Sequence, residues 1–123
     1  MVNLNRRIVS ALSSFGLPIA ETLYEGTAPS YFVYSIVYDV AGDTGDDVPQ
    51  TYVATVQIHY VCGALNASYA VMRRRIRQAL VDAGFTAPEI TDMSDTKDKI
   101  RRLVFECEIE NNYDIEREEQ TNG

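Results

Sequence analysis

Residues 52–61 read YVATVQIHYV, and this run gives the clearest structural signal in the chain. Tyrosine, valine and isoleucine suit a pleated sheet, and residues two apart on a strand point to the same face. One face carries Val53, Thr55, Gln57, His59 and Val61, and the other carries Tyr52, Ala54, Val56, Ile58 and Tyr60. The second face is the more apolar, so we predict that it packs on the core.

The preceding run, residues 31–39, is apolar on both faces apart from Ser35 and Asp39. Such a strand is either central and covered twice, or it offers one face to another subunit. Residues 40–50 join the two runs and hold two glycines, three aspartates and a proline. We expect a long, mobile hairpin loop that serves a function or becomes ordered on a partner.

The first predicted helix covers residues 3–15. It begins at Asn3, a suitable N-cap, and ends before Gly16 and Pro18, which stop helices. Its apolar residues recur on one face at Leu4, Ile8, Leu12 and Phe15. This spacing predicts an amphipathic helix that packs on the core.

The second predicted helix covers residues 66–83. Asn66 or Ser68 can cap its start, and Gly84 stands where a C-cap belongs. Its apolar stripe consists of Tyr69, Met72, Ile76, Ala79, Leu80 and Ala83. This stripe also predicts packing on the core.

Three further runs complete the predicted sheet. Residues 17–24 and 85–93 contain Pro18 and Pro88, and they suit sheet edges because proline cannot donate to a strand ladder. Residues 99–109 alternate as a clear strand. The element order α-β-β-β-α-β-β predicts an α+β fold, with a mainly antiparallel sheet of four to five strands and two helices packed on one face.

The chain has 123 residues, the length of one ordinary domain. We predict a single α+β domain over residues 1–110 and an acidic, flexible tail over residues 111–123, which holds few apolar side chains. Cys62 and Cys107 lack a CxxC spacing and fall in strand-like runs, which predicts buried free thiols.

Charge and hydropathy limit the class of partner. The formal net charge of −7 disfavours tight, non-specific binding of nucleic acid, which depends on lysine and arginine. No apolar run has the length of a membrane span, and the N-terminal residues lack the apolar region of a signal peptide. We therefore expect a protein made in the cytoplasm that does not contact a membrane.

Residues suited to catalysis are few. His59 is the single histidine, it lies on a strand beside Gln57 and Thr55, and no nucleophile, zinc, phosphate-loop or dinucleotide motif accompanies it. A packed or solvated side chain is the more frequent role for such a histidine. We expect no enzymatic activity and no cofactor.

The aspartates near the predicted loop invite a calcium interpretation. Asp39, Asp43, Asp46 and Asp47 offer oxygen ligands, but their spacing does not match an EF-hand and no closing glutamate follows. We predict a solvated hairpin tip and no dedicated metal site. Weak divalent binding at a subunit interface remains an open alternative.

Arg73, Arg74, Arg75 and Arg77 form the densest positive charge, on the second predicted helix. They are either a solvated helix face or a contact with acidic surface on a neighbouring copy, such as residues 39–47 or 110–119. As candidate interface residues we take the four arginines, with Asp43, Asp46 and Asp47 as loop contacts.

Taken together, these features resemble a known family. They are the short N-terminal helix, the strand pair around an acidic loop, the helical run MRRRIRQAL at residues 72–80, the segment AGF at 83–85 and the closing strand RLVFECEI at 102–109. The pattern, over residues 1–110, resembles the tail terminator (tail completion) and related neck proteins of long-tailed bacteriophages and prophages.

The resemblance implies a structural protein of the virion without enzymatic activity. It implies a ring, typically a hexamer, that caps the tail tube, joins it to the head connector or completion protein, and lets DNA pass without specific binding. The protein would be assembled in the host bacterial cytoplasm and lie at the head–tail junction of the virion.

Two other functions stay open. The protein could be another neck component, such as a head-completion protein. It could also be a small-molecule-binding α+β module whose pocket walls are the tyrosines Tyr31, Tyr34, Tyr38, Tyr52 and Tyr60. Tyrosines on strands serve more often in sheet packing than in a pocket.

Overall fold

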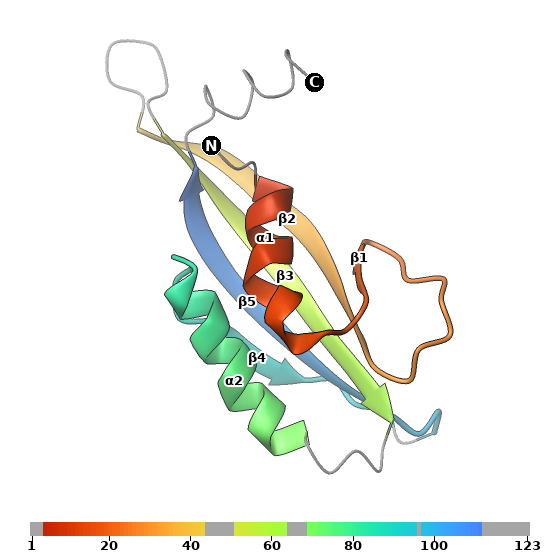
Figure 1. Ribbon diagram of the computed structural model, residues 1–123. Coiled ribbons are helices and arrows are strands. Elements are labelled where there is room, and N and C mark those ends of the chain that lie inside the picture. The colour runs from red at the N-terminus through yellow and green to blue at the C-terminus, as the bar shows by residue number, and fades with distance from the viewer. Residues whose placement is uncertain (1–3, 44–50, 64–68, 96, 112–123) are drawn as a thin grey trace.

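A computed structural model describes residues 4–43, 51–63, 69–95 and 97–111 (Figure 1). Its helical elements are α1 (Leu4–Leu12), the 3-10 turn η1 (Ser13–Phe15) and α2 (Tyr69–Asp82). Its strands are β1 (Ile19–Glu21), β2 (Tyr31–Asp43), β3 (Thr51–Gly63), β4 (Glu89–Asp92) and β5 (Ile100–Asn111). The strands form one sheet in the order β1-β2-β3-β5-β4.

The predicted α+β class is confirmed, but the sheet is mixed. The pairs β2–β3, β3–β5 and β4–β5 are antiparallel, whereas β1 runs parallel to β2 and aligns Ile19 with Phe32. Residues 22–30 carry the chain from the end of β1 back to the start of β2, as Figure 1 shows. The two strands therefore point the same way, which a hairpin would not allow.

Several predicted boundaries were wrong. β2 continues to Asp43, so residues 40–43 belong to a strand rather than to the loop, and β5 includes Glu110 and Asn111. Both strands are long because they pair with β3 along nearly their whole length. The two edge strands are shorter than predicted and begin directly after Pro18 and Pro88, which lack the N–H that a ladder needs.

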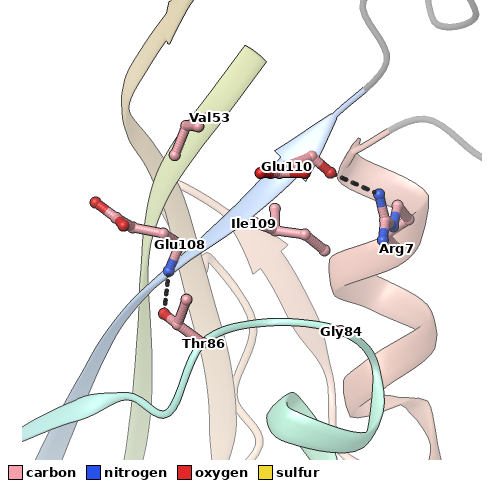
Figure 2. Close-up of a pocket in the computed structure, with 7 residues that line it drawn as sticks. All are labelled: Arg7, Val53, Gly84, Thr86, Glu108, Ile109 and Glu110. Carbon is pink, nitrogen blue, oxygen red and sulfur yellow. Dashed lines mark hydrogen bonds between the residues drawn. The ribbon is translucent and has the colours of Figure 1, made fainter. Parts of the chain in front are cut away.

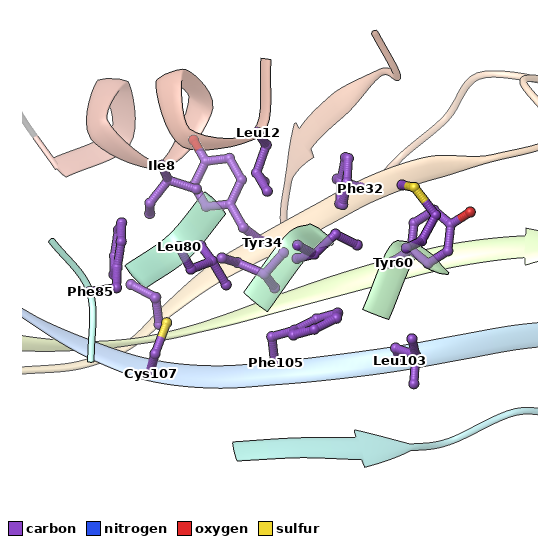
Figure 3. Close-up of a cluster of buried hydrophobic side chains, with 14 of the residues drawn as sticks. Ile8, Leu12, Phe32, Tyr34, Tyr60, Leu80, Phe85, Leu103, Phe105 and Cys107 are labelled. Carbon is purple, nitrogen blue, oxygen red and sulfur yellow. The ribbon is translucent and has the colours of Figure 1, made fainter. Parts of the chain in front are cut away.

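Both helices lie on the same side of the sheet and enclose the core (Figures 1 and 3). The predicted stripes are confirmed for the buried residues Leu4, Ile8 and Leu12 in α1, and Tyr69, Met72, Ile76 and Leu80 in α2. The other predicted members, Phe15, Ala79 and Ala83, are half-buried. Ile58 and Phe105 meet them from β3 and β5 with no exposed surface. This burial of apolar surface stabilises the arrangement of the layers.

The predicted end signals of the two helices are also present. Gly16 has φ of +71°, and its N–H donates to the carbonyl of Ser13 at 3.2 Å. Gly84 follows α2 with φ of +100°. Both angles favour glycine, which adopts positive φ without strain. The predicted caps Asn3, Asn66 and Ser68 lie outside the described residues.

Cys62 and Cys107 are buried and free, as predicted. No helix in the described part of the chain is long and apolar enough to cross a membrane.

Candidate functional site

The face of the sheet that points away from the helices, here called the open face, is the first candidate site. Its described side chains are Ala20 of β1; Tyr31, Val33 and Ser35 of β2; Val53, Thr55, Gln57, His59 and the buried Val61 of β3; Glu89 and Thr91 of β4; and Arg102, Val104, Glu106, Glu108 and Glu110 of β5. The described residues place no helix on this side (Figure 1).

The described residues cover the two faces of the apolar strand β2 to different extents. Phe32 and Tyr34 are buried in the core, whereas Val33 is half-buried and Val37, at a register shift with β3, is 52% exposed. The described part of the chain therefore does not cover β2 twice. That another subunit covers its second face stays a prediction.

Polar pairs cross the open face between β3 and β5. Gln57 Nε2 donates to Glu106 Oε1 at 2.8 Å, and Thr55 Oγ1 donates to Glu108 Oε2 at 3.5 Å. Such cross-strand pairs hold the two strands in register. The acidic residues still present exposed side chains beyond these bonds.

His59 belongs to the same set of pairs. Its Nδ1 accepts a hydrogen bond from Arg102 Nη1 at 2.9 Å, because a guanidinium can only donate. Burial, and then the positive charge of Arg102, lower the pKa of His59. The imidazole is therefore neutral at pH 7, and its neighbour is an arginine rather than a nucleophile.

A small hollow of about 150 Å³ indents the open face where β4 meets β5. It is lined by Gln57, Glu89, Thr91, Met93, Val104 and Glu106. Glu89 and Glu106 are direct cross-strand partners, an arrangement that places like charges opposite each other and weakens the strand pair. A positively charged group in this hollow would relieve that repulsion.

A larger depression of about 470 Å³ lies at the junction of α1, β5 and the segment after α2 (Figure 2). Arg7 Nη1 donates to the carbonyl of Glu110 at 3.2 Å. Thr86 Oγ1 accepts from the N–H of Glu108 at 2.9 Å, and the N–H of Thr86 donates to the Glu108 carbonyl at 2.9 Å. These polar groups join the elements to one another, so we interpret the depression as a structural junction.

The four arginines of α2 do not form one uniform surface. Arg74, Arg75 and Arg77 are exposed, and Arg73 is half-buried with its Nε buried and without a hydrogen-bond partner in the described structure. The guanidinium of Arg75 lies 5.5 Å from the ring centre of Phe15. Arg74 and Arg77 are therefore the two most available for a partner.

Arg73 lies near a polar cluster that joins the start of α2 to the end of β4. Tyr69 donates from its hydroxyl to Asp92 Oδ2 at 2.9 Å, and Ser94 Oγ donates to Asp92 Oδ1 at 2.6 Å. The bond from Ser94, and to a lesser extent the charge of Arg73, lower the pKa of Asp92. The guanidinium carbon of Arg101 lies over the Tyr69 ring, 4.4 Å from the ring centre. The cluster fixes α2 on the sheet.

The predicted loop contacts are only partly placed. Asp43 is the last residue of β2, and Asp46 and Asp47 lie outside the described residues. Among the residues that are described, no group of three or more histidine, cysteine, aspartate or glutamate side chains could hold a metal ion. Contacts of these aspartates with a neighbouring copy or a divalent ion stay predictions.

The formal charges of the chain are strongly segregated. The two helices carry six arginines and one aspartate, a charge of +5, so with a total of −7 the remainder of the chain carries −12. We did not predict Glu89, Glu106 and Glu108 as site residues, whereas Glu110 falls in the acidic range 110–119 that was predicted as a possible contact for the arginines. The alternation of β5 placed Glu106 and Glu108 on one face, but the sequence alone did not indicate that this face stays uncovered.

No protein-family model matches this chain, and a search of curated proteins finds no match.

Proposed function

We propose that this protein is a structural subunit that assembles with copies of itself. Following the resemblance to phage tail terminators, the assembly is a ring that ends the tail tube and joins it to the head connector, with DNA passing through. The observation that carries the proposal is the contrast between a basic helix layer and an acidic, uncovered sheet face on one small domain. Surfaces of opposite charge on one chain favour association between copies.

The state of the reactive side chains supports a structural role. His59 is held by Arg102, and burial raises the pKa of both Cys62 and Cys107, the latter to about 12. A buried thiol with a raised pKa is a poor nucleophile. His59 is thus paired with an arginine rather than a nucleophile, and neither Cys62 nor Cys107 is an accessible thiolate.

The acidic remainder of the chain supports the passage of DNA through such a ring. A lumen lined by carboxylates repels phosphate and does not retain DNA, since retention depends on lysine and arginine. A head-completion protein would meet the same requirement, so the choice between the two neck proteins rests on the resemblance.

The alternative of a small-molecule module has less support. Tyr34 and Tyr60 are buried in the core, and Tyr31 stacks on Tyr24 with ring centres 4.2 Å apart. None of these three tyrosines lines either of the two depressions described above. The side chains of Tyr38 and Tyr52 lie outside the described part of the chain.

Two measurements test the proposal: the mass of the protein in solution, and its binding to purified tail tubes and to DNA-filled heads. Size-exclusion chromatography with light scattering should show a ring-sized oligomer, alone or after addition of purified tail tubes, and electron microscopy should show rings at tube ends. Binding to DNA-filled heads but not to tubes would favour a head-completion protein. The structural role would be contradicted if the protein is a monomer that binds neither tail tubes nor heads and if a small-molecule ligand raises its melting temperature.

A further inference from the structure

We infer that the α2 face of one copy docks on the open face of the next copy, with Arg74 and Arg77 against Glu89 and Glu106. The contact is head-to-tail, because each copy offers a different surface to each of its two neighbours. This inference rests on the proposed function, since it assumes that the chain assembles with itself.

Charge complementarity identifies a second copy as the occupant of the open face. The helices hold a formal charge of +5, whereas the open face presents the exposed acids Glu89, Glu106, Glu108 and Glu110. The one arginine among its described side chains, Arg102, already donates to His59. A surface of this charge selects a basic partner, and the chain carries such a partner on its own opposite side.

The hollow between β4 and β5 has the chemistry of an arginine site. Glu89 and Glu106 lie opposite each other at its rim, while Val104 and Met93 supply apolar lining. A guanidinium binds carboxylates with a planar, forked geometry, and the aliphatic stem of arginine covers apolar surface. An arginine from a neighbour would relieve the repulsion between the two glutamates.

On the helix side, Arg74 lies in a stripe that is also partly apolar. Val71, Arg74, Gln78 and Val81 are spaced by three, four and three residues, which places them on one side of the helix. Val71 is 44% exposed and Val81 is 41% exposed, and Met93 beside the hollow is 58% exposed. Exposed ion pairs alone contribute little, so apolar side chains within the contact are needed to exclude water.

The same charges determine the symmetry. A two-fold dimer through either of these faces would place like surfaces together, helix layer on helix layer or open face on open face, and would be repelled. A head-to-tail contact instead pairs opposite charges at every interface and generates a ring when its rotation closes. The segregated charges therefore favour the ring that the proposed function requires.

Charge reversal tests the contact. The first variant combines Arg74→Glu with Arg77→Glu, and the second combines Glu89→Arg with Glu106→Arg. Each should weaken self-association by about tenfold or more in low salt, since one partner of each pair now repels the other. A chain with all four changes keeps the wild-type net charge of −7 and should assemble again. An equal mixture of the two double variants should also assemble, while each alone does not.

Matched controls are Lys97→Glu and Glu25→Arg, which reverse exposed charges away from both surfaces and should leave assembly unchanged. Circular dichroism verifies folding, and if the second variant misfolds, Glu89→Gln with Glu106→Gln replaces it and should also weaken association. If the wild type assembles and both double variants assemble equally well, this inference is overturned and the proposed function stays intact. Loss of assembly without rescue, in the chain with four changes or in the mixture, would also overturn it. A wild-type chain that is monomeric with and without tail tubes would overturn the proposed function.

Discussion

The two faces of the sheet differ sharply, although the same strands build both. On β3 the residues Ala54, Val56 and Ile58 point to the helices and have no exposed surface. Their neighbours Thr55 and Gln57 point to the open face, are half-buried and bond to glutamates of β5. Alternation along one strand thus separates the residues that stabilise the fold from the residues that are free to meet a partner.

This difference shows where selection for a function can act with little effect on folding. Burial of a large apolar side chain contributes about 1.5–3 kcal/mol, whereas a cross-strand polar pair contributes about 0.2–1 kcal/mol. Charge can therefore accumulate on the open face while the covered face keeps the domain folded. The repulsion of Glu89 and Glu106 is small enough to persist in such a domain.

The largest difference expected between the two faces is in thiol reactivity. Burial raises the pKa of Cys107 from 9.0 to about 12, which lowers its thiolate fraction near neutral pH by about a thousandfold. A thiol reagent such as DTNB should therefore label the native chain no faster than the chain unfolds. In denaturant, the reagent should label both cysteines rapidly. In a Glu108→Cys variant, the added thiol on the open face should react promptly. Rapid labelling of the native wild type would contradict the burial of Cys107.

How much of this contrast is readable from the sequence depends on the element. The apolar stripe through Ile8 and Leu12 and the alternation of residues 52–61 depend on local periodicity, and they predicted the helices, β3 and the core face correctly. The parallel pairing of β1 was missed because it depends on the path of residues 22–30, which no local pattern specifies.

The candidate site was harder to predict, for a related reason. The arginines of α2 were visible as a cluster of charge, but which of them bind within the chain depends on tertiary neighbours such as Phe15 beside Arg75. The facing pair Glu89 and Glu106 joins residues seventeen positions apart through strand register. Sequence spacing does not reveal such a pair, because register is set by the packing of the whole sheet.

A second prediction compares adjacent residues on the two faces of β3. Ile58→Ala removes a side chain with no exposed surface and should lower the free energy of unfolding by about 2–5 kcal/mol, through lost burial and the cavity that remains. Gln57→Ala removes the 2.8 Å bond to Glu106 at a half-buried position and should lower it by less than about 1 kcal/mol. Denaturant unfolding followed by circular dichroism measures both values. Similar losses in the two variants would mean that the faces do not differ as described.

The smallest predicted effect is a pH dependence that arises on the open face. Burial and the charge of Arg102 lower the pKa of His59 below its ordinary value of 6.5, so the unfolded chain binds a proton more readily than the folded chain. The resulting stability is fully present above pH 6.5 and is lost as the pH falls through 6.5 toward the folded pKa. His59→Gln keeps an acceptor for Arg102 but cannot titrate. Unfolding measured between about pH 7.5 and pH 5, above the ordinary range of carboxyl groups, should therefore show a smaller decline for the variant than for the wild type. Equal declines would show that the imidazole beside Arg102 is not held neutral.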